Sequence, residues 1–411
     1  MGPMPTRQQR RPRSVVPLLA GLVAGALVSS VGVAIGAVPT AVRPTAAASQ
    51  PAAQPAAVSP AATPEPAPPG DRVPACTAKV AAMTPRDRLA QRLMVGVDAA
   101  NPRAAAETVR SSQVGGVFLG GNGTALLRNS QLTRLQAMAR VPVAVAVDDE
   151  GGRVQRIDDL DGSLPSARTM ARTMTVEQVR EAGRKRGSQL LARGVTWNFA
   201  PTVDVSDQAA NSVIGDRSFS DDPDVVTRYA AAWAQGQREA GVFGVLKHFP
   251  GHGHADGDSH RGRVTTPPLA RLKADDLRPY ADLLGPAGAL RAGGAGVMVG
   301  HLDTPGLTDG LPGSLTPAVY QLLRGEYGFD GLVVTDDLGA MKAITGQFTL
   351  PQATVRALQA GADMALSSNV TPVAPTLDAL ERALADGRIS TADNDRAVAR
   401  ILTAKGLCSP A

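Results

Sequence analysis

The chain has 411 residues, of which 43% are hydrophobic and 19% are charged, and its formal net charge is +5. This length and apolar content can build a sizeable core, which excludes a chain that is disordered throughout. Most of the positive charge lies in the first 73 residues, and the remainder is close to neutral. We therefore expect no nucleic-acid binding by the folded part.

Residues 1–42 have the composition of an export segment. Four arginines between positions 7 and 13 are followed by an uncharged run, residues 14–42, rich in Ala, Val, Leu and Gly. The run is intermediate in length between the apolar core of a signal peptide and a membrane-spanning helix. We expect either cleavage and secretion, or an uncleaved anchor that holds the protein on the outer face of the cytoplasmic membrane.

Residues 43–73 are a Pro/Ala-rich low-complexity stretch, which predicts an extended linker before a folded domain at 74–411. The two cysteines of the chain, Cys76 and Cys408, lie at the two ends of that domain. In an exported protein such a pair favours a disulfide over two free thiols. We therefore expect a fold whose ends meet.

From residue 76 onward, short runs rich in Val, Gly and Ala alternate with segments that carry helix start signals, such as Thr84-Pro85 and Asp222-Pro223. This alternation is typical of parallel βα units and of the α/β class. Eight such units predict a single (β/α)₈ TIM-like barrel. The candidate strands are residues 92–97, 114–119, 141–147, 195–201, 242–248, 295–301, 331–336 and 362–368.

Polar side chains follow these apolar runs at the points where the strands end. In a barrel of parallel strands the carboxyl ends meet on one face, where enzymes of this architecture carry their active sites. Because charges beside buried strands are costly unless they are paired, we predict a functional site on this face. The polar residues are Asp148–Glu150, Asn198, Asp204, Lys247, His248, His301, Asp336 and Asp337.

The stretch "KHFPGHGHADGDSH", residues 247–260, holds four of the five histidines of the chain. His248 and His252 have the spacing of zinc ligands on a helix, and His254 and Asp258 could complete the set. However, Pro250 and the interspersed glycines disfavour a helix, so we predict no metal. The glycines also lack the spacing of a nucleotide-phosphate loop.

An acid/base function fits the end of this stretch better. Asp258 lies two residues before His260, so its carboxylate can orient an imidazole that exchanges protons near neutral pH. Asp336, at the end of an apolar strand, can act as the nucleophile. The neighbouring Asp337 should point the opposite way in an extended segment, and we expect backbone donors to hold it in a structural role.

These blocks carry a family resemblance over about residues 80–405. "KHFPGHG", followed by four residues and "DSH", resembles the signature of family 3 glycoside hydrolases of the β-N-acetylglucosaminidase type, whose catalytic domain is a (β/α)₈-like barrel. Other blocks resemble that family in the same order: "VDDEGGRVQRI" from Val147, "NFAPTVDV" from Asn198, "NSVIGDRSFSDDP" from Asn211 and "LLRGEYGFDGLVVTDDL" from Leu322.

The resemblance implies a role for each matching residue. Asp336 would be the nucleophile that forms a glycosyl-enzyme intermediate, His260 the general acid and then base, and Asp258 the partner that orients it. The positions that would contact the terminal N-acetylglucosamine are Asp148, Arg156, Arg217, Lys247 and His248. A retaining mechanism needs such a nucleophile and a proton donor on opposite faces of the sugar.

Several residues near these blocks have simpler interpretations. Arg156 and Arg217 could instead form scaffold ion pairs with Asp148 or Asp216. We expect Glu150 to fix the turn before Gly151-Gly152. His252 is assigned to loop structure, and His254 and Asp256 to solvent.

The resemblance therefore implies an exported, cofactor-free and monomeric retaining exo-β-N-acetylglucosaminidase. Its carbohydrate substrates would be N-acetylglucosaminides, including muropeptides from peptidoglycan, and its N-terminal segment could associate with the membrane or cell wall. One alternative is a phosphorylase, because a histidine acid/base would not repel a phosphate dianion. Another is a non-enzymatic sugar-binding module, although such a relative would be expected to lose Asp336 or the pair of Asp258 and His260.

Overall fold

A computed structural model describes residues 76–291 and 293–408 of the chain. The predicted export segment at 1–42 and the Pro/Ala-rich linker at 43–73 lie outside the described residues. No helix in the described ranges is long and apolar enough to cross a membrane.

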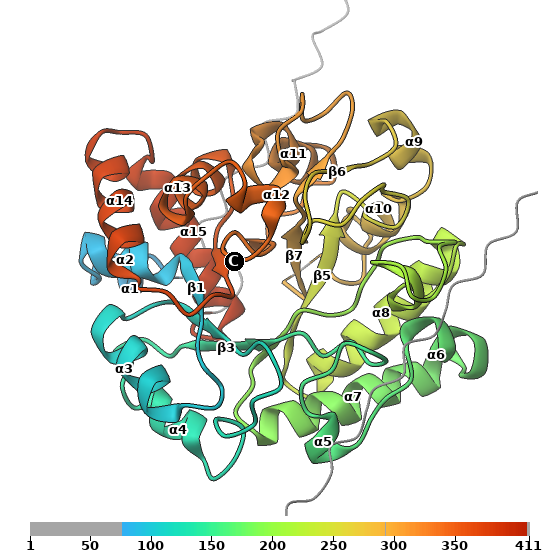
Figure 1. Cartoon of the computed structure of the whole chain (residues 1–411), viewed down its shortest axis with the longest axis horizontal. Helices are drawn as coiled ribbons and strands as arrows, with labels where there is room; N and C mark the ends of the chain where they lie inside the picture. Colours follow the sequence, from blue (N-terminus) through green and yellow to red (C-terminus); the bar gives the residue numbers. More distant parts are fainter. Residues whose placement is uncertain (1–75, 292, 409–411) are drawn as a thin grey trace, which may run out of the picture. The chain divides into compact units, whose positions relative to one another are not determined.

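Eight strands form one parallel sheet in the order β10-β1-β2-β3-β4-β5-β7-β9 (Figure 1). A parallel bridge between Val334 and Met364 joins the last strand of that order to the first. The predicted (β/α)₈ barrel is therefore confirmed, and each predicted range overlaps one strand. The strands are β1 (Leu93–Gly96), β2 (Gly116–Phe118), β3 (Ala144–Val147), β4 (Trp197–Asn198), β5 (Phe243–Phe249), β7 (Gly296–Val299), β9 (Val333–Thr335) and β10 (Ala365–Ser367).

Helices surround these strands on the outside (Figure 1). The long ones are amphipathic and bury one face against the sheet. The α-helices are α1 (Thr77–Ala81), α2 (Pro85–Gln91), α3 (Pro102–Ser112), α4 (Gln131–Gln136), α5 (Asp158–Asp161), α6 (Ala167–Thr173), α7 (Val176–Ala192), α8 (Pro223–Glu239), α9 (Leu269–Ala274), α10 (Arg278–Leu284), α11 (Pro317–Gln321), α12 (Lys342–Thr345), α13 (Leu350–Ala360), α14 (Ala374–Ala385) and α15 (Thr391–Ala404). Shorter helical turns are η1 (Gly215–Arg217), η2 (Gly313–Leu315) and η3 (Leu322–Glu326).

Both helix starts named from the sequence are capped as expected. The Thr84 side chain accepts a hydrogen bond of 3.1 Å from the backbone N–H of Asp87 at the start of α2. Asp222 caps α8 in the same way, with a 2.8 Å bond from the N–H of Asp224. In both cases proline occupies the first helical position, where its missing N–H costs nothing.

A second, two-stranded parallel sheet was not predicted. It pairs β6 (Val264–Thr265) with β8 (Leu302–Asp303), outside the barrel sheet. Each strand is two residues long, too short to leave an alternating pattern in the sequence. Its consequence is local: it fixes the far end of the loop that carries Asp258 and His260.

The barrel interior is packed with large apolar side chains, including Met94, Phe118, Trp197 and Met298. Ile401 of α15 joins the same cluster. α15 therefore helps to close the barrel at the end where the strands begin. The opposite end, where the strands finish, is left for polar loops.

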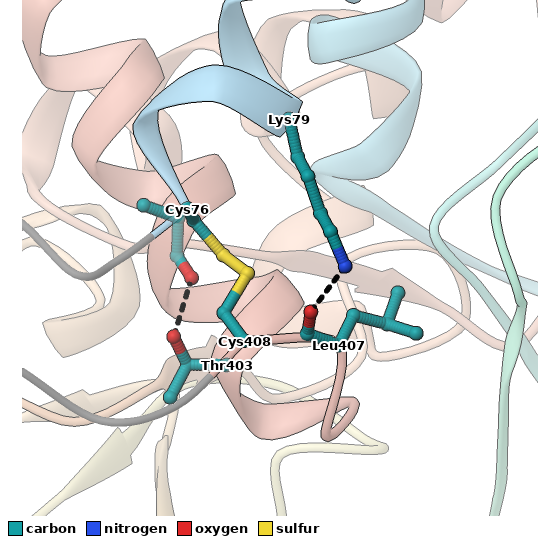
Figure 2. The surroundings of a disulfide bond; sticks show 6 residues. Cys76, Lys79, Thr403, Leu407 and Cys408 are labelled. Carbon is teal, nitrogen blue, oxygen red and sulfur yellow. Dashed lines mark hydrogen bonds between the residues drawn. A yellow bond between two sulfur atoms is a disulfide. The ribbon is translucent and has the colours of Figure 1, made fainter.

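The two ends of the described chain meet at a disulfide between Cys76 and Cys408, as predicted (Figure 2). Their Cα atoms lie 5.6 Å apart, although the two residues are separated by 332 positions in the sequence. The bond joins the residue before α1 to the residues after α15. Lys79 reinforces the junction by donating a hydrogen bond to the carbonyl oxygen of Leu407.

Candidate active site

A cavity of about 770 Å³ opens among the loops that follow the carboxyl ends of the strands. This volume is typical of a site for a small organic ligand. The cavity gathers seven of the eight residues predicted for catalysis or substrate binding. These are Asp148, Arg156, Arg217, Lys247, His248, His260 and Asp336.

A buried lysine, a partly buried arginine and two carboxylates form a network in the cavity wall. The Lys247 ammonium lies 2.6 Å from Asp148 Oδ1 and 2.5 Å from Glu150 Oε1. The Arg217 guanidinium donates two hydrogen bonds of 2.8 Å to the Glu150 carboxylate. Burial opposes the charge of Glu150, but the two cations hold the pKa of Glu150 well below its usual range. Likewise, Asp148 and Glu150 outweigh burial and raise the pKa of Lys247.

The prediction that Glu150 fixes the turn is wrong, because the adjacent Asp149 does so. Asp149 Oδ2 accepts hydrogen bonds from the backbone N–H groups of Arg156, at 2.8 Å, and Ile157, at 3.3 Å. Side chains alternate along an extended segment, so Asp148 and Glu150 share one side and Asp149 takes the other. That alternation was the available signal.

Arg217 pairs with Glu150 and not with Asp148 or Asp216, the scaffold partners considered from the sequence. Asp216 instead binds Arg153 at 2.8 Å. The predicted contact position Arg156 lies in the cavity wall, where its Nη1 donates to the carbonyl oxygen of Gln155.

Arg153 was missed from the sequence, although it shapes the site. Its guanidinium donates to four carbonyl oxygens of one loop, those of Ala210, Ser212, Val213 and Ile214. This clamp holds the loop that leads into η1 and Arg217. The partners lie about sixty positions away, so no local pattern reveals them.

His248 is oriented by Asp204, which the sequence placed on the polar face of the barrel without a specific role. His248 Nδ1 lies 2.7 Å from Asp204 Oδ2, and both groups are buried. Asp204 Oδ1 also accepts hydrogen bonds from the backbone N–H groups of His248, at 3.2 Å, and His252, at 2.7 Å. One carboxylate thus joins the segment after β4 to the end of β5 and to the loop that follows it.

His252 belongs to the cavity wall as well as to the loop. Its ring packs edge-on against His248, with centroids 5.7 Å apart, and neither ring nitrogen has a hydrogen-bond partner among the described residues. Burial, together with the neighbouring His248, lowers the pKa of His252 to about 4. This imidazole is therefore neutral near pH 7.

Asp336 follows β9 and lines the cavity with its carboxylate only 6% exposed. Burial alone would raise its pKa, but the nearby His301 and His248, with Lys247, hold the pKa below its usual range. The backbone N–H of Asp337 adds a 2.8 Å hydrogen bond to Asp336 Oδ1. Asp336 is thus an ionised carboxylate with limited hydration, as a nucleophile requires.

Asp337 takes the structural role that its position predicted. Its Oδ1 accepts hydrogen bonds from the backbone N–H groups of Gly339, at 2.8 Å, and Ser368, at 2.9 Å. It therefore ties the loop after β9 to the loop after β10. His301, the fifth histidine, supports the same turn through a 2.9 Å contact between its Nε2 and the carbonyl oxygen of Asp337.

Asp258 and His260 form the expected pair on a loop at the edge of the cavity. Asp258 Oδ1 lies 3.0 Å from His260 Nδ1 and also accepts the backbone N–H of His260 at 3.0 Å. The His260 side chain is 64% exposed and lines the cavity, whereas Asp258 is not part of the lining. Asp258 has a lowered pKa, because hydrogen bonds from His260 outweigh its partial burial.

The prediction that His254 faces solvent is wrong, whereas Asp256 is exposed as predicted. His254 Nδ1 lies 3.0 Å from the buried Asp276, which the junction between α9 and α10 brings against the loop. Together with Asp275, these two residues form a group that could hold a cation, because one ligand atom from each lies within 4.8 Å of the other two.

The structure does not gather the four residues weighed as metal ligands from the sequence. Asp204, Asp276 and Asp258 bind His248, His254 and His260 separately. Gly253, between His252 and His254, packs directly against the chain after β4, because a Cβ there would meet the carbonyl oxygen of Val205 at 1.8 Å.

Comparisons of the sequence and of the structure with known proteins point to the same family. The sequence profile of the family described as "Glycosyl hydrolase family 3 N terminal domain" matches residues 84–404. The chain is 49% identical over 334 residues to β-hexosaminidase LpqI of Mycobacterium tuberculosis, covering 79% of this chain and 84% of that protein.

Two solved structures are similar along most of the described chain. A family 3 glycosyl hydrolase from Mycobacterium smegmatis has 50% identity and a TM-score of 0.74, with 80% of this chain and 99% of that chain covered. A family 3 β-N-acetylglucosaminidase from Paenibacillus has 33% identity and a TM-score of 0.73, with 79% of this chain and 63% of that one covered.

Proposed function

The chain belongs to glycosyl hydrolase family 3, and we propose on that basis that it is a retaining exo-β-N-acetylglucosaminidase. It removes N-acetylglucosamine from the non-reducing ends of its substrates. The names of its relatives, β-hexosaminidase and β-N-acetylglucosaminidase, support this activity. The observation that carries the proposal is the cavity itself, which holds an ionised buried carboxylate, Asp336, and a carboxylate-bound histidine, His260.

In the proposed first step, an oxygen of Asp336 attacks the anomeric carbon and the bond to the leaving oxygen breaks. His260 gives its proton to that oxygen, so the leaving group departs as a neutral alcohol. In the second step, His260 takes a proton from water while the water oxygen attacks the anomeric carbon. This releases Asp336 as a carboxylate and restores the protonated His260.

Asp258 assists both steps by fixing one ring nitrogen. An ionised carboxylate can only accept hydrogen bonds, so it holds the proton on Nδ1 of His260 and leaves Nε2 to exchange protons with the substrate. The exposure of this pair supports a mobile donor that approaches the leaving group, whereas the burial of Asp336 supports a fixed nucleophile.

The proposed sugar contacts are Asp148, Arg156, Arg217, Lys247 and His248. Asp148 is the more exposed partner of Lys247, at 24%, and can accept hydrogen bonds from sugar hydroxyl groups. Lys247 and Arg217 are held in place by Glu150, which makes the contact positions rigid before the sugar arrives. Hydrogen bonds to charged groups are stronger than neutral ones, so few contacts can fix one sugar.

We further propose that the natural substrates are N-acetylglucosaminides of the cell wall, including muropeptides, and that the protein acts as an exported monomer. The composition of residues 1–42 and 43–73, which predicts an export segment and a linker before a domain at 74–411, supports this location. The disulfide between Cys76 and Cys408 agrees with an oxidising compartment.

The test compares wild type with Asp336→Ala and His260→Ala on an aryl β-N-acetylglucosaminide, with and without phosphate. We expect hydrolysis that does not depend on phosphate, is insensitive to EDTA and is lost in Asp336→Ala. Near wild-type turnover in either variant would refute the role of that residue. Formation of sugar 1-phosphate would instead identify a phosphorylase, and tight sugar binding without turnover would identify a binding module.

A further inference from the structure

Asp204 has no role in the proposed reaction. It is nevertheless more deeply buried, and accepts more hydrogen bonds, than Asp258, the proposed partner of His260. It is fully enclosed and receives three hydrogen bonds, two of them from His248. The third comes from the backbone of His252. His248 lies near the end of β5 and His252 lies in the loop that follows it, and both residues line the cavity. Asp204 therefore fixes this part of the cavity wall from behind.

The charge of Asp204 determines which nitrogen of His248 carries the hydrogen. Burial opposes ionisation of Asp204, but His248 and the backbone donor of His252 outweigh it and lower the pKa of the carboxyl. An ionised carboxylate is an acceptor only, so Nδ1 of His248 must be the donor across the 2.7 Å contact. Nε2 forms no hydrogen bond with the described residues, and it is left for a ligand in the cavity.

Among the described residues, Asp204 is the carboxylate that lies against the His248 ring. Asp276, the other buried carboxylate nearby, is bound to His254. His248 thus has one carboxylate partner among the described residues, and that partner comes from the segment after β4.

We propose that Asp204 is a positioning residue for the glycosidase reaction: it locks His248 in the tautomer with hydrogen on Nδ1 and presents Nε2 to the sugar. This role rests on the proposed function, which supplies the sugar as the ligand. The role extends the proposed function. Asp204 does not touch the substrate, but it determines whether Nε2 of His248 accepts or donates a hydrogen bond there.

The direct test uses the wild-type protein, labelled with ¹⁵N in histidine. The chain has five histidines, so its imidazole spectrum is small enough to assign by comparison with His248→Gln. We expect the His248 ring to carry hydrogen on Nδ1 throughout the neutral pH range. A neutral ring with hydrogen on Nε2 alone would overturn the proposal, and this measurement needs no variant of Asp204 to fold.

The kinetic test uses Asp204→Asn, which keeps the shape but turns a donor toward Nδ1 and so favours the opposite tautomer. We expect kcat/KM to fall about tenfold to a hundredfold, mostly through a higher KM, because a hydrogen bond with a charged partner is lost. Asp276→Asn is the matched control: it removes an equally buried carboxylate from a histidine outside the cavity, and its kcat/KM should stay within about twofold of wild type.

A double-mutant cycle separates positioning from general support of the fold. If Asp204 acts through His248, Asp204→Asn should cause little further loss in a His248→Asn background. Full additivity of the two losses would overturn the proposal. If the wild type hydrolyses no N-acetylglucosaminide, the proposed function fails, but the ¹⁵N spectrum still decides whether Asp204 sets the tautomer.

Discussion

The two ends of the 247–260 segment carry the same chemical pair, an aspartate bound to Nδ1 of a histidine, in opposite surroundings. Asp204 and His248 are buried, whereas the His260 side chain is 64% exposed beside Asp258. The buried partner comes from a different strand segment, and the exposed partner lies two residues away on the same loop. In the proposed function, the buried pair serves fixed binding and the exposed pair serves proton transfer.

The largest expected effect separates these two roles. His260→Ala should lower kcat by about a hundredfold to ten-thousandfold, because general acid/base catalysis contributes roughly that much. In His260→Ala, the loss of rate in the first step should be smaller for aryl leaving groups that need little protonation in order to depart. His248→Ala should instead raise KM and show no such dependence. Steady-state kinetics over a series of aryl glycosides measures both, and equal leaving-group dependence would remove the distinction.

A smaller effect is expected from the backbone of the acid/base loop. Gly257, which precedes Asp258, has φ of 104°, and a Cβ there would meet the carbonyl oxygen of Arg263 at 2.9 Å. Gly257→Ala should therefore displace the exposed pair and lower kcat about tenfold, since such strain costs about 1–3 kcal/mol. Gly262→Ala is the control on the same loop, because its Cβ would meet nothing within 4 Å. Equal kcat values for the two variants would show that the loop does not need this conformation.

The smallest expected effect concerns pH. Asp336 must be ionised to attack, and its pKa is lowered against burial first by His301 and then by His248. His301→Gln removes the largest contribution that lowers the pKa of Asp336, so this pKa should rise and the acidic limb of the kcat/KM profile should move to higher pH. The shift is expected to be the same in direction for every substrate. If the acidic limb stays at the same pH or moves to lower pH, His301 does not lower the pKa of Asp336.

The barrel and most of the cavity could be predicted from the sequence because both depend on local patterns. Eight apolar runs with polar residues at their ends determine the strands and the face where Asp336 and Lys247 lie. The partners of those residues could not be predicted in this way. Asp204 reaches His248 across 44 positions, and Arg153 reaches its loop across about sixty. Such pairings depend on how the loops pack, and no spacing in the sequence encodes them.

The misassignment of Glu150 has a more specific cause. A carboxylate before two glycines is a common turn-former, and both Asp149 and Glu150 satisfied that description. Only the alternation along the extended segment distinguishes them, because it places Glu150 on the same side as Asp148. Applying the strand period beyond the end of β3 would have identified Glu150 as a site residue.

The bond between Cys76 and Cys408 makes the folded domain a covalent ring. A protease that cuts any exposed loop between these residues would open the ring without releasing a fragment. The two pieces would stay attached, so the barrel could keep its strands together and the cavity could keep its shape. Without this bond, the first cut would leave two pieces held together by noncovalent contacts alone.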